Sequence, residues 1–509
     1  RLSNLYLKLA SRLYSKQKPC SVSRIVRVFL RFGLRETAQT PTKPAIDVMN
    51  GKIHKASILL LFGGLILGQA ADWPTYQHDY SRSGVAGESL LTPFSDGWVH
   101  RSKHEPRPAW RGEAKWDGYN KVYDMKSRQV FDYAFHTVIV DGRVYFGSSA
   151  DDKVYCLDAV TGKQQWVFFT EGPIRLAPTV VKGRLYVGSD DGHAYCLDAV
   201  TGKLIWQIRV GPKDYRIPGN GRIISRWPLR TGIVVVGKNA YCAAGMFPSE
   251  GVFITAIDTE TGKVKWQQKQ GDLPAQGYLL ASQTRLYVPA GRNNPVVLNR
   301  ADGKRIRVVS GQGGTYALLT GDSLVFGPGK TGTLGFVESN RGDQLASFKG
   351  NHMIVTPEMS YLQSDTHLSA LDRQRYLQLA RERRTLQSRQ KATSEQLKKT
   401  KSTSVDQRKL LQKQLTELGQ SIDKATTEMG ECFPWQVRCD QPLSMVLAGQ
   451  TLVTGGHNSI AAYDARTGKQ LWRGKAEGDV FGLAVSGGRL FASTNRGVIH
   501  CLEAKRLAK

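Results

Sequence analysis

The chain has 509 residues, of which 40% are hydrophobic and 52 are glycine. That length would usually indicate two or more domains, but a single closed all-β ring can also use most of it, and abundant glycine suits short strands joined by tight turns. The formal net charge of +28 is concentrated partly in residues 1–48 and 373–430, and no nucleic-acid module is recognisable, so we interpret it as solvated charge and expect no nucleic-acid partner.

A signal-peptide pattern begins at the first methionine, Met49. A short basic stretch precedes an apolar run from Ile58 to Leu67, and small residues follow it around Ala70. This layout predicts a cleaved signal peptide over residues 49–71, and hence a periplasmic or secreted protein with no stable membrane span after cleavage. An uncleaved anchor is the alternative, although ten apolar residues are fewer than the roughly 20 that span a bilayer. Residues 1–48 resemble misassigned upstream translation or a targeting extension.

A repeat is the strongest signal in the sequence. The motif Asp-x-x-Thr-Gly-Lys-x-x-Trp occurs without error at Asp158–Trp166, Asp198–Trp206, Asp258–Trp266 and Asp464–Trp472. Degenerate or interrupted copies begin at Asn299, Glu338, Asp372 and Glu503. The steps between successive copies are 40, 60, 41, 39, 34, 92 and 39 residues. A base period near 40 is the length of one four-stranded propeller blade.

Each unit contains four short β-rich runs separated by turn residues. The Asp of the motif is expected to accept hydrogen bonds within its own turn, and the Gly to supply a positive φ, so that the third and fourth strands form a hairpin. The Trp then points from the outermost strand to the neighbouring blade, where a large flat ring buries much area. Every part of the motif therefore has a structural role, and none of them requires catalysis.

Eight copies predict an all-β fold, an eight-bladed β-propeller over residues 94–509. The copy at Glu503 has no fourth strand after it. The stretch Asp96-Gly97-Trp98 resembles the end of the motif, so we expect residues 97–101 to supply the missing strand. Closure of this kind removes both exposed edges of the ring.

The extra 20 residues of the third unit form an arginine-rich insert. It contains Arg222, Arg226, Trp227 and Arg230. The insert precedes an innermost strand, so we expect it over one mouth of the central channel, with Glu250 facing it. Guanidinium forks bind carboxylates in pairs, which makes these five residues a candidate site for a small anionic ligand or cofactor. An ordered loop whose arginines cap carbonyl groups is the alternative.

The 92-residue step contains an insert of helical character, residues 373–430, which is rich in Gln, Lys, Arg, Leu and Glu and has no Pro. A 4-3-4 spacing places four apolar side chains on one helical face: Leu411, Leu415, Leu418 and Ile422. Ser404 followed by Gln407 predicts a capping box for a second helix. We therefore expect a helical hairpin, a coiled coil, inserted in the sixth blade. It is either a solvated spacer or a partner-docking arm.

The cysteines fall into two groups. Cys156, Cys196 and Cys501 share one repeat position, where a cysteine is most simply a small buried hydrophobe. Cys432 and Cys439 flank Trp435 beside the helical insert. An exported protein can pair such cysteines, but spacing alone leaves the pairing open.

The repeat resembles the tryptophan-docking motif of pyrroloquinoline-quinone (PQQ)-type propellers over roughly residues 94–504. That superfamily includes quinoprotein alcohol dehydrogenases and the propeller lipoprotein of the outer-membrane β-barrel assembly machine. The resemblance implies the fold strongly, whereas it leaves the function open. Unlike the lipoprotein, this chain has no Cys after the apolar run of its signal peptide.

Two classes of function follow from this resemblance. The first is a binding or scaffold propeller without catalysis, whose partner is a protein or a small anionic ligand. The second is a PQQ- and calcium-dependent oxidoreductase, which needs a held quinone, a calcium ion with oxygen ligands and a carboxylate base. No adjacent cysteine pair, haem-attachment motif or calcium set is recognisable, and Asp190-Asp191 reads as turn residues. We therefore assign no catalytic or metal-binding residues and expect no cofactor. A sensor domain of a larger fused protein is a third possibility.

Overall fold

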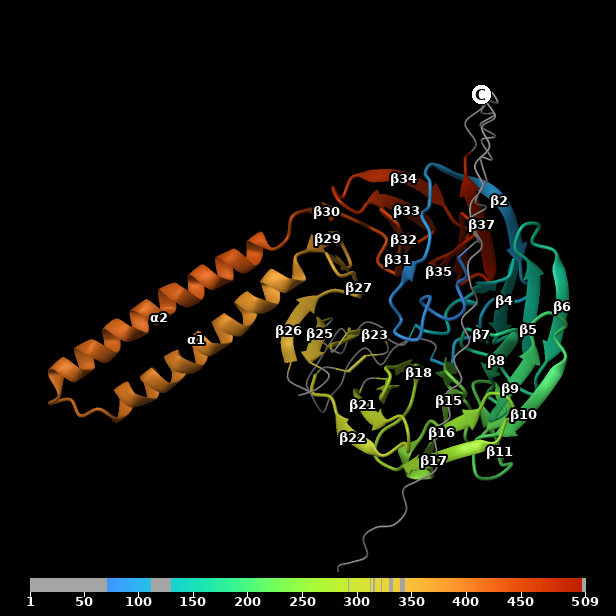
Figure 1. Ribbon diagram of the computed structural model, residues 1–509, viewed down its shortest axis with the longest axis horizontal. Helices are drawn as coiled ribbons and strands as arrows, with labels where there is room; N and C mark the ends of the chain where they lie inside the picture. Colours follow the sequence, from blue (N-terminus) through green and yellow to red (C-terminus); the bar gives the residue numbers. More distant parts are fainter. Residues whose placement is uncertain are drawn as a thin grey trace, which may run out of the picture. The chain divides into compact units, whose positions relative to one another are not determined.

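The strands of this computed structural model form an eight-bladed propeller, with the blades arranged radially around a common axis (Figure 1). The structure describes residues 71–110, 130–291, 293–311, 313–314, 316–321, 323–328, 333–338 and 344–505. The predicted fold class is confirmed. The predicted signal peptide, apart from Ala71, and the extension over residues 1–48 lie outside the described residues.

The blades are four-stranded antiparallel sheets, and seven of them follow chain order. Blades 1 to 4 consist of β3 (Val138–Val140), β4 (Arg143–Ser148), β5 (Lys153–Asp158) and β6 (Gln164–Phe169); β7 (Thr179–Val181), β8 (Arg184–Gly188), β9 (His193–Asp198) and β10 (Leu204–Arg209); β14 (Val234–Val236), β15 (Asn239–Ala244), β16 (Val252–Asp258) and β17 (Val264–Gln270); and β19 (Leu280–Ala281), β20 (Arg285–Ala290), β21 (Asn293–Asn299) and β22 (Arg305–Val308).

Blades 5 to 8 consist of β23 (Tyr316–Thr320), β24 (Ser323–Gly327), β25 (Thr333–Glu338) and β26 (Gln344–Lys349); β27 (His352–Val355), β28 (Ser360–Gln363), β29 (His367–Leu371) and β30 (Gln436–Arg438); β31 (Ser444–Ala448), β32 (Thr451–Gly456), β33 (Ser459–Asp464) and β34 (Gln470–Lys475); and β35 (Val480–Ser486), β36 (Arg489–Thr494), β37 (Val498–Ala504) and β2 (Phe94–Arg101). The short elements outside these blades are β1 (Val85–Ala86), β11 (Arg216–Gly219), β12 (Arg222–Ser225), β13 (Thr231–Gly232), η1 (Pro248–Glu250) and β18 (Gly277–Tyr278).

The ring closes between the two ends of the propeller sequence. Strand β2 pairs antiparallel with β37, with Trp98 opposite Cys501 and Arg101 opposite Val498. The prediction that residues 97–101 complete the last blade is confirmed, and the strand begins slightly earlier, at Phe94. Blade 8 is therefore built from both ends of the propeller, and β2 covers the edge that β37 would otherwise expose.

The repeat motif forms the turn that was predicted from it. Asp158 Oδ1 accepts hydrogen bonds from the backbone N–H of Val160 (3.1 Å) and of Thr161 (2.8 Å), and Gly162 has a φ of 70°. The tryptophan docks on the next blade, since Trp206 Nε1 donates to the carbonyl of Thr259 at 3.1 Å. The sequence motif thus encodes both the hairpin within a blade and the contact between blades.

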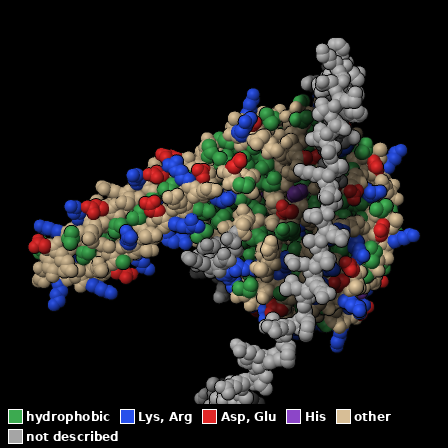
Figure 2. All heavy atoms as spheres, in the orientation of Figure 1, with side chains coloured by type: hydrophobic (Ala, Val, Ile, Leu, Met, Phe, Trp, Pro, Cys, Tyr) green, Lys and Arg blue, Asp and Glu red, His purple; other side chains and the backbone are tan. Residues whose placement is uncertain are grey.

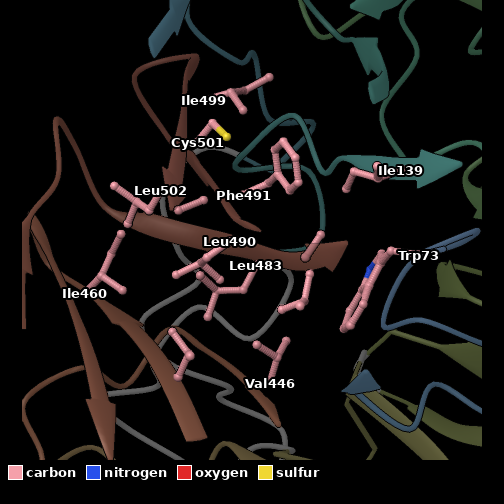
Figure 3. Packing of buried hydrophobic residues seen from close by; sticks show 14 of the residues in the cluster. Trp73, Ile139, Val446, Ile460, Leu483, Leu490, Phe491, Ile499, Cys501 and Leu502 are labelled. Atoms are coloured by element: carbon pink, nitrogen blue, oxygen red, sulfur yellow. The ribbon is translucent and has the colours of Figure 1, made fainter. Parts of the chain in front are cut away.

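The hydrophobic core lies between neighbouring blades. The largest buried cluster joins blades 7, 8 and 1, and Figure 3 shows Leu490 and Phe491 of β36 within it. Ile139 of β3 belongs to the same cluster, and so does Trp73, which precedes the ring in sequence. Both Trp73 and Ile139 are 1% exposed, so residues far apart in the sequence share one dry interface.

A segment ahead of the ring, residues 72–86, runs along the inner strands of several blades; we call it the plug segment. Backbone hydrogen bonds join it to blades 1, 2, 4, 5 and 7 through Ile139, Val180, Ala281, Leu319 and Leu447. Its last residues form β1, which pairs in parallel with β31 and adds a fifth strand to blade 7. The repeat pattern did not predict this segment, because it contains no copy of the motif.

Two helices, α1 (Arg373–Lys399) and α2 (Val405–Glu431), lie between β29 and β30 of blade 6 and run side by side away from the ring (Figure 1). The predicted helical hairpin is confirmed in that blade. Its base is part of the core, where Leu377 and Met429 are buried in one cluster with Phe348 of β26. Supercoiling of the two helices stays a prediction.

The capping box predicted at Ser404 is wrong. Ser404 is the N-cap residue of α2, but its side chain makes no capping hydrogen bond. Its ψ of 63° departs from the extended conformation in which an N-cap side chain reaches the first free N–H groups. Arg408 instead stabilises this end of the hairpin, because Nη1 donates to the carbonyls of Leu397 (3.2 Å) and Thr400 (2.9 Å) at the end of α1.

The described cysteines are all unpaired and buried. Cys432 packs in the cluster at the base of the hairpin, whereas Cys439 packs between blades 6 and 7. Cys156, Cys196 and Cys501 are each fully buried, as expected for small hydrophobic residues inside strands. Among the described residues, no helix combines the length and apolar character that crossing a bilayer requires.

Candidate functional site

A cavity of about 560 Å³ lies at the centre of the propeller, and we call it the channel pocket. Six aromatic side chains line it: Tyr76, Phe131, Tyr133, Tyr278, Tyr316 and Phe481. Polar side chains come from Asn351, His352, Asp365, Asp440 and His457. These residues belong to the inner strands and loops of several blades, so only the closed ring assembles the pocket. Its size is in the range of small-molecule sites.

The plug segment supplies one wall of the channel pocket. Tyr76 stacks on Tyr278 with a ring-centroid distance of 3.6 Å and an interplanar angle of 3°. The guanidinium of Arg82 lies 5.5 Å from the Tyr278 centroid and donates to the carbonyls of Tyr76 (2.9 Å) and Leu279 (3.1 Å). Burial lowers the pKa of Arg82 to about 10, which still leaves it charged at neutral pH. A buried cation thus fixes the position of the aromatic wall.

His136 lies beside this aromatic pair. Its ring meets Tyr76 edge to face at 5.0 Å, and its side chain is buried. Burial lowers the pKa of His136 to about 4, because the charged imidazolium would lose its hydration. At neutral pH the imidazole of His136 is therefore uncharged.

The remaining polar groups in the channel pocket are mostly acidic or neutral. Asp365 Oδ1 accepts from Asn351 Nδ2 at 3.0 Å. Burial alone would raise the pKa of Asp440, but its hydrogen bond with Arg473 (2.8 Å) holds that pKa below its ordinary value. Asp440 is therefore a carboxylate at neutral pH. No Lys or Arg occurs among the described residues that line the channel pocket.

The five residues predicted as an anion site lie outside the channel pocket, and their charges are already paired. Arg222 pairs with Asp152, and Arg226 pairs with Glu250. Glu250 thus faces the arginines of the insert as expected, and its carbonyl accepts from Trp227 Nε1 at 3.0 Å. Arg230 is buried and binds Asp190 at 3.1 Å. Because the protein itself supplies these partners, a ligand role for the insert stays a prediction.

Arg230 belongs to a buried ionic network that sequence reasoning missed. Asp190 also accepts from Arg175 Nε at 2.6 Å, and Arg175 Nη1 reaches Asp132 Oδ2 at 3.2 Å. The side chains of both aspartates are fully buried, and burial raises the pKa of Asp132. Asp190 is thus more than a turn residue. The sequence did contain a signal for this second role. The turn needs only Asp191, which accepts a hydrogen bond from the N–H of His193 (2.8 Å), so the neighbouring Asp190 is free for another function.

Comparisons with known proteins agree with this architecture. The family model described as "Outer membrane protein assembly factor BamB" matches residues 107–252 and 434–507. The dehydrogenase subunit of the quinone alcohol dehydrogenase of Acetobacter aceti is 29% identical over 222 residues, which are 38% of this chain and 25% of that subunit. The corresponding subunit of Gluconobacter oxydans (strain 621H) is 28% identical over 219 residues, 39% of this chain and 25% of the subunit. The chain therefore spans about a quarter of these relatives.

Solved structures show the same fold at low sequence identity. The quinohemoprotein alcohol dehydrogenase of Comamonas testosteroni superposes with a TM-score of 0.57 at 13% identity, covering 86% of this chain and 82% of its own. A europium-containing methanol dehydrogenase gives a TM-score of 0.51 at 10% identity, covering 85% and 98%. At such identities the likeness concerns the fold alone.

Proposed function

We propose that this chain, a propeller of the PQQ-like repeat family, is an exported binding or scaffold module without redox activity of its own. The channel pocket is the proposed ligand-binding site. Alternatively, a protein partner binds the face of the propeller on which this pocket opens. The observation that carries the proposal is the chemistry of the pocket walls, which are aromatic, with carboxylates and without described Lys or Arg.

The residues of the channel pocket do not fit PQQ. PQQ carries three carboxylates, and a buried anion of that kind needs cationic or multiple N–H partners. The described lining contains no Lys or Arg side chain that could pair with those carboxylates. No cluster of three or more His, Cys, Asp or Glu side chains arranged to hold a metal ion occurs among the residues that the structure describes. The channel pocket therefore does not fit this cofactor.

A neutral or cationic small molecule fits the channel pocket better. Aromatic faces attract organic cations through the quadrupole of the ring, and a nearby carboxylate adds Coulombic attraction. Tyr316 and Phe481 supply the aromatic faces, and Asp440 supplies a carboxylate that a ligand cation would share with Arg473. The binding site is preformed, since Arg82 and the backbone hydrogen bonds of the plug segment fix the position of Tyr76 in the pocket wall.

A titration with PQQ and Ca²⁺ tests the proposal directly. Purified protein is titrated while binding is followed by absorbance, and dye reduction is then assayed with alcohols and sugars. We expect neither stoichiometric binding nor turnover. Stoichiometric binding with dye reduction would overturn the proposal in favour of an oxidoreductase, the activity named for the two curated relatives. Binding without turnover would also contradict the proposed ligand chemistry and would favour a PQQ sensor.

The arginine-rich insert is a second candidate binding site, in this case for an anion. Arg222 lines a shallow hollow of about 530 Å³ with Pro218, Asn220 and Ile223. An anion there must compete with Asp152 for Arg222 and with Glu250 for Arg226. Citrate binding that is lost in Arg222→Ala would support this site, whereas an unaltered chain that does not bind citrate would exclude it.

Export is part of the proposal and has its own test. N-terminal sequencing of exported material is expected to give a start near Ala70 or Ala71. A mature start within residues 1–48 would contradict the signal peptide.

A further inference from the structure

The outer end of the helical hairpin, residues 398–413, carries a dense positive charge, and we call it the hairpin tip. It contains six Lys or Arg residues and a single acidic residue, Asp406. Lys and Arg side chains stand out along the hairpin and around its end (Figure 2). Helices of 27 residues are about 40 Å long, so the tip is held far from the base that packs on blade 5.

The hairpin tip also exposes two aliphatic side chains. Val405 is 54% exposed and Leu410 is 56% exposed. Neither contributes to the seam between the helices, where Leu411 is the buried residue of that turn. Exposed apolar residues are common singly, but here two of them lie within six residues among lysines.

The structure of the hairpin explains only part of this composition. Lys398 and Lys399 lie in the last turn of α1, where cations are favourable at the negative end of the helix dipole. Arg408 caps the carbonyls at the same end. Lys401 and Lys409 are exposed and have no ion pair recorded within the described part of the chain, so helix stability does not account for them.

We propose that the hairpin tip docks on an anionic lipid surface, with Lys401 and Lys409 among the headgroups and Val405 and Leu410 inserted at the boundary of the acyl chains. Basic residues combined with exposed aliphatic side chains are the features that give peripheral attachment to acidic bilayers. This inference goes beyond the proposed function of the channel pocket and does not depend on it.

The chemistry of the tip favours a lipid surface over a protein partner. Protein interfaces rely on aromatic and arginine anchors in fitted pockets, and they are depleted in lysine. The tip has no aromatic residue, and its single arginine, Arg408, is occupied in capping. Flexible lysines are point charges that need no shape complementarity, which suits a fluid surface.

Vesicle sedimentation tests the inference with the complete propeller, including the helical hairpin. Binding is compared between vesicles of phosphatidylcholine alone and vesicles with one quarter phosphatidylglycerol. We expect binding to the anionic vesicles only, with at least tenfold loss in the double variant Lys401→Glu/Lys409→Glu. The matched control is Lys163→Glu/Lys203→Glu, which changes the net charge equally at two exposed turns of the ring and is expected to change binding less than twofold.

A second variant separates insertion from simple charge attraction. Val405→Ser/Leu410→Ser keeps every charge, and we expect it to remove the part of the binding that resists 0.5 M salt. The proposal is overturned if the unaltered chain does not bind anionic vesicles, or if the two double Lys→Glu variants weaken binding equally. It is also overturned if the serine variant binds as well as the unaltered chain at high salt. Circular dichroism melting of each variant confirms that the ring is folded.

Discussion

The indole ring of Trp98 packs on Gly162, so that a residue of blade 8 rests on the hairpin turn of blade 1. Trp98 Nε1 donates to the carbonyl of Ala159 at 3.1 Å. A Cβ added to Gly162 would lie 2.7 Å from the ring, and the φ of 70° is also unfavourable for other residues. The same pairing recurs between Trp206 and Gly262, so the closing contact of the ring is equivalent to an internal one.

The first prediction concerns this docking contact. We expect Gly162→Ala to lower the free energy of unfolding by about 2–4 kcal/mol, because it adds a clash to backbone strain. Gly183→Ala is the matched control, since Gly183 has nearly the same φ of 71° but no atom within 4 Å of an added Cβ, and it should cost about 1 kcal/mol. Urea titration measures both. Equal losses would show that the Trp98 contact does not matter.

The second prediction separates the plug segment from ring closure. A chain that begins at Gly87 loses the plug but keeps β2, and it should fold with a lowered melting temperature. A chain that begins at Ser102 also leaves β37 without a partner, so we expect a further fall in stability and aggregation through the exposed edge. Thermal melting and light scattering compare the two. If the chain that begins at Ser102 melted at the same temperature as the full chain, β2 would not close the ring.

The third prediction contrasts two arginines of the insert. Removing Arg230 leaves Asp190 buried with one fewer partner, so Arg230→Ala should destabilise the fold by about 3–5 kcal/mol. Arg226 and its partner Glu250 are each about one-third exposed, and Arg226→Ala should cost less than about 1 kcal/mol. Chemical unfolding gives both values. A large loss from Arg226→Ala alone would contradict the assignment of the buried network to Arg230.

The fourth prediction is a loss of stability in mild acid that depends on His136. Its pKa falls from 6.5 to about 4 on folding, so below pH 6.5 the unfolded chain binds a proton that the folded chain does not. Stability should therefore decline as the pH falls from 6.5 to 4, by about 2 kcal/mol between pH 7 and pH 5. His136→Phe should reduce this difference, as measured by urea unfolding at both pH values. An unchanged pH dependence would show that His136 is not the responsible group.

The fifth prediction concerns the two parts of the hairpin. Replacing residues 385–420 with a short Gly/Ser linker should leave the melting temperature almost unchanged, because loop closure depends only weakly on length. Met429→Ala should cost about 2–4 kcal/mol, since Met429 is 5% exposed in the cluster beneath the hairpin. Differential scanning calorimetry measures the melting temperature of each variant. A large loss on shortening would show that the outer helices also support the ring.

The predictable part of this fold is the part that repeats. The spacing from Asp158 to Trp166 encodes local turn chemistry, and local chemistry can be deduced from neighbouring residues. Ring closure by Trp98 was predictable for the same reason, because β2 imitates the end of the motif. The helical hairpin was predictable from its period, although the side chain of Ser404 does not make the bond that its sequence context suggested.

The unpredicted part depends on contacts between residues that are distant in sequence and share no pattern. The plug segment meets five blades through scattered backbone hydrogen bonds, and nothing in its own residues specifies those partners. Asp190 looked like a turn residue because the arginines that bind it, Arg175 and Arg230, come from a preceding loop and from the insert. The walls of the channel pocket likewise combine a few residues from each of several distant parts of the chain.

The pairing of β2 with β37 makes completion of the ring a late event in the life of the chain. Ser95 and Glu503, which face each other across that pair, are 408 residues apart in sequence. During synthesis, β2 is made before the strands of any blade, yet its partner β37 is made last, so β2 stays unpaired until then. Such high contact order slows folding and calls for chaperone protection of the waiting strand. A chain interrupted before blade 8 cannot close, and the open edge exposes it to proteolytic clearance.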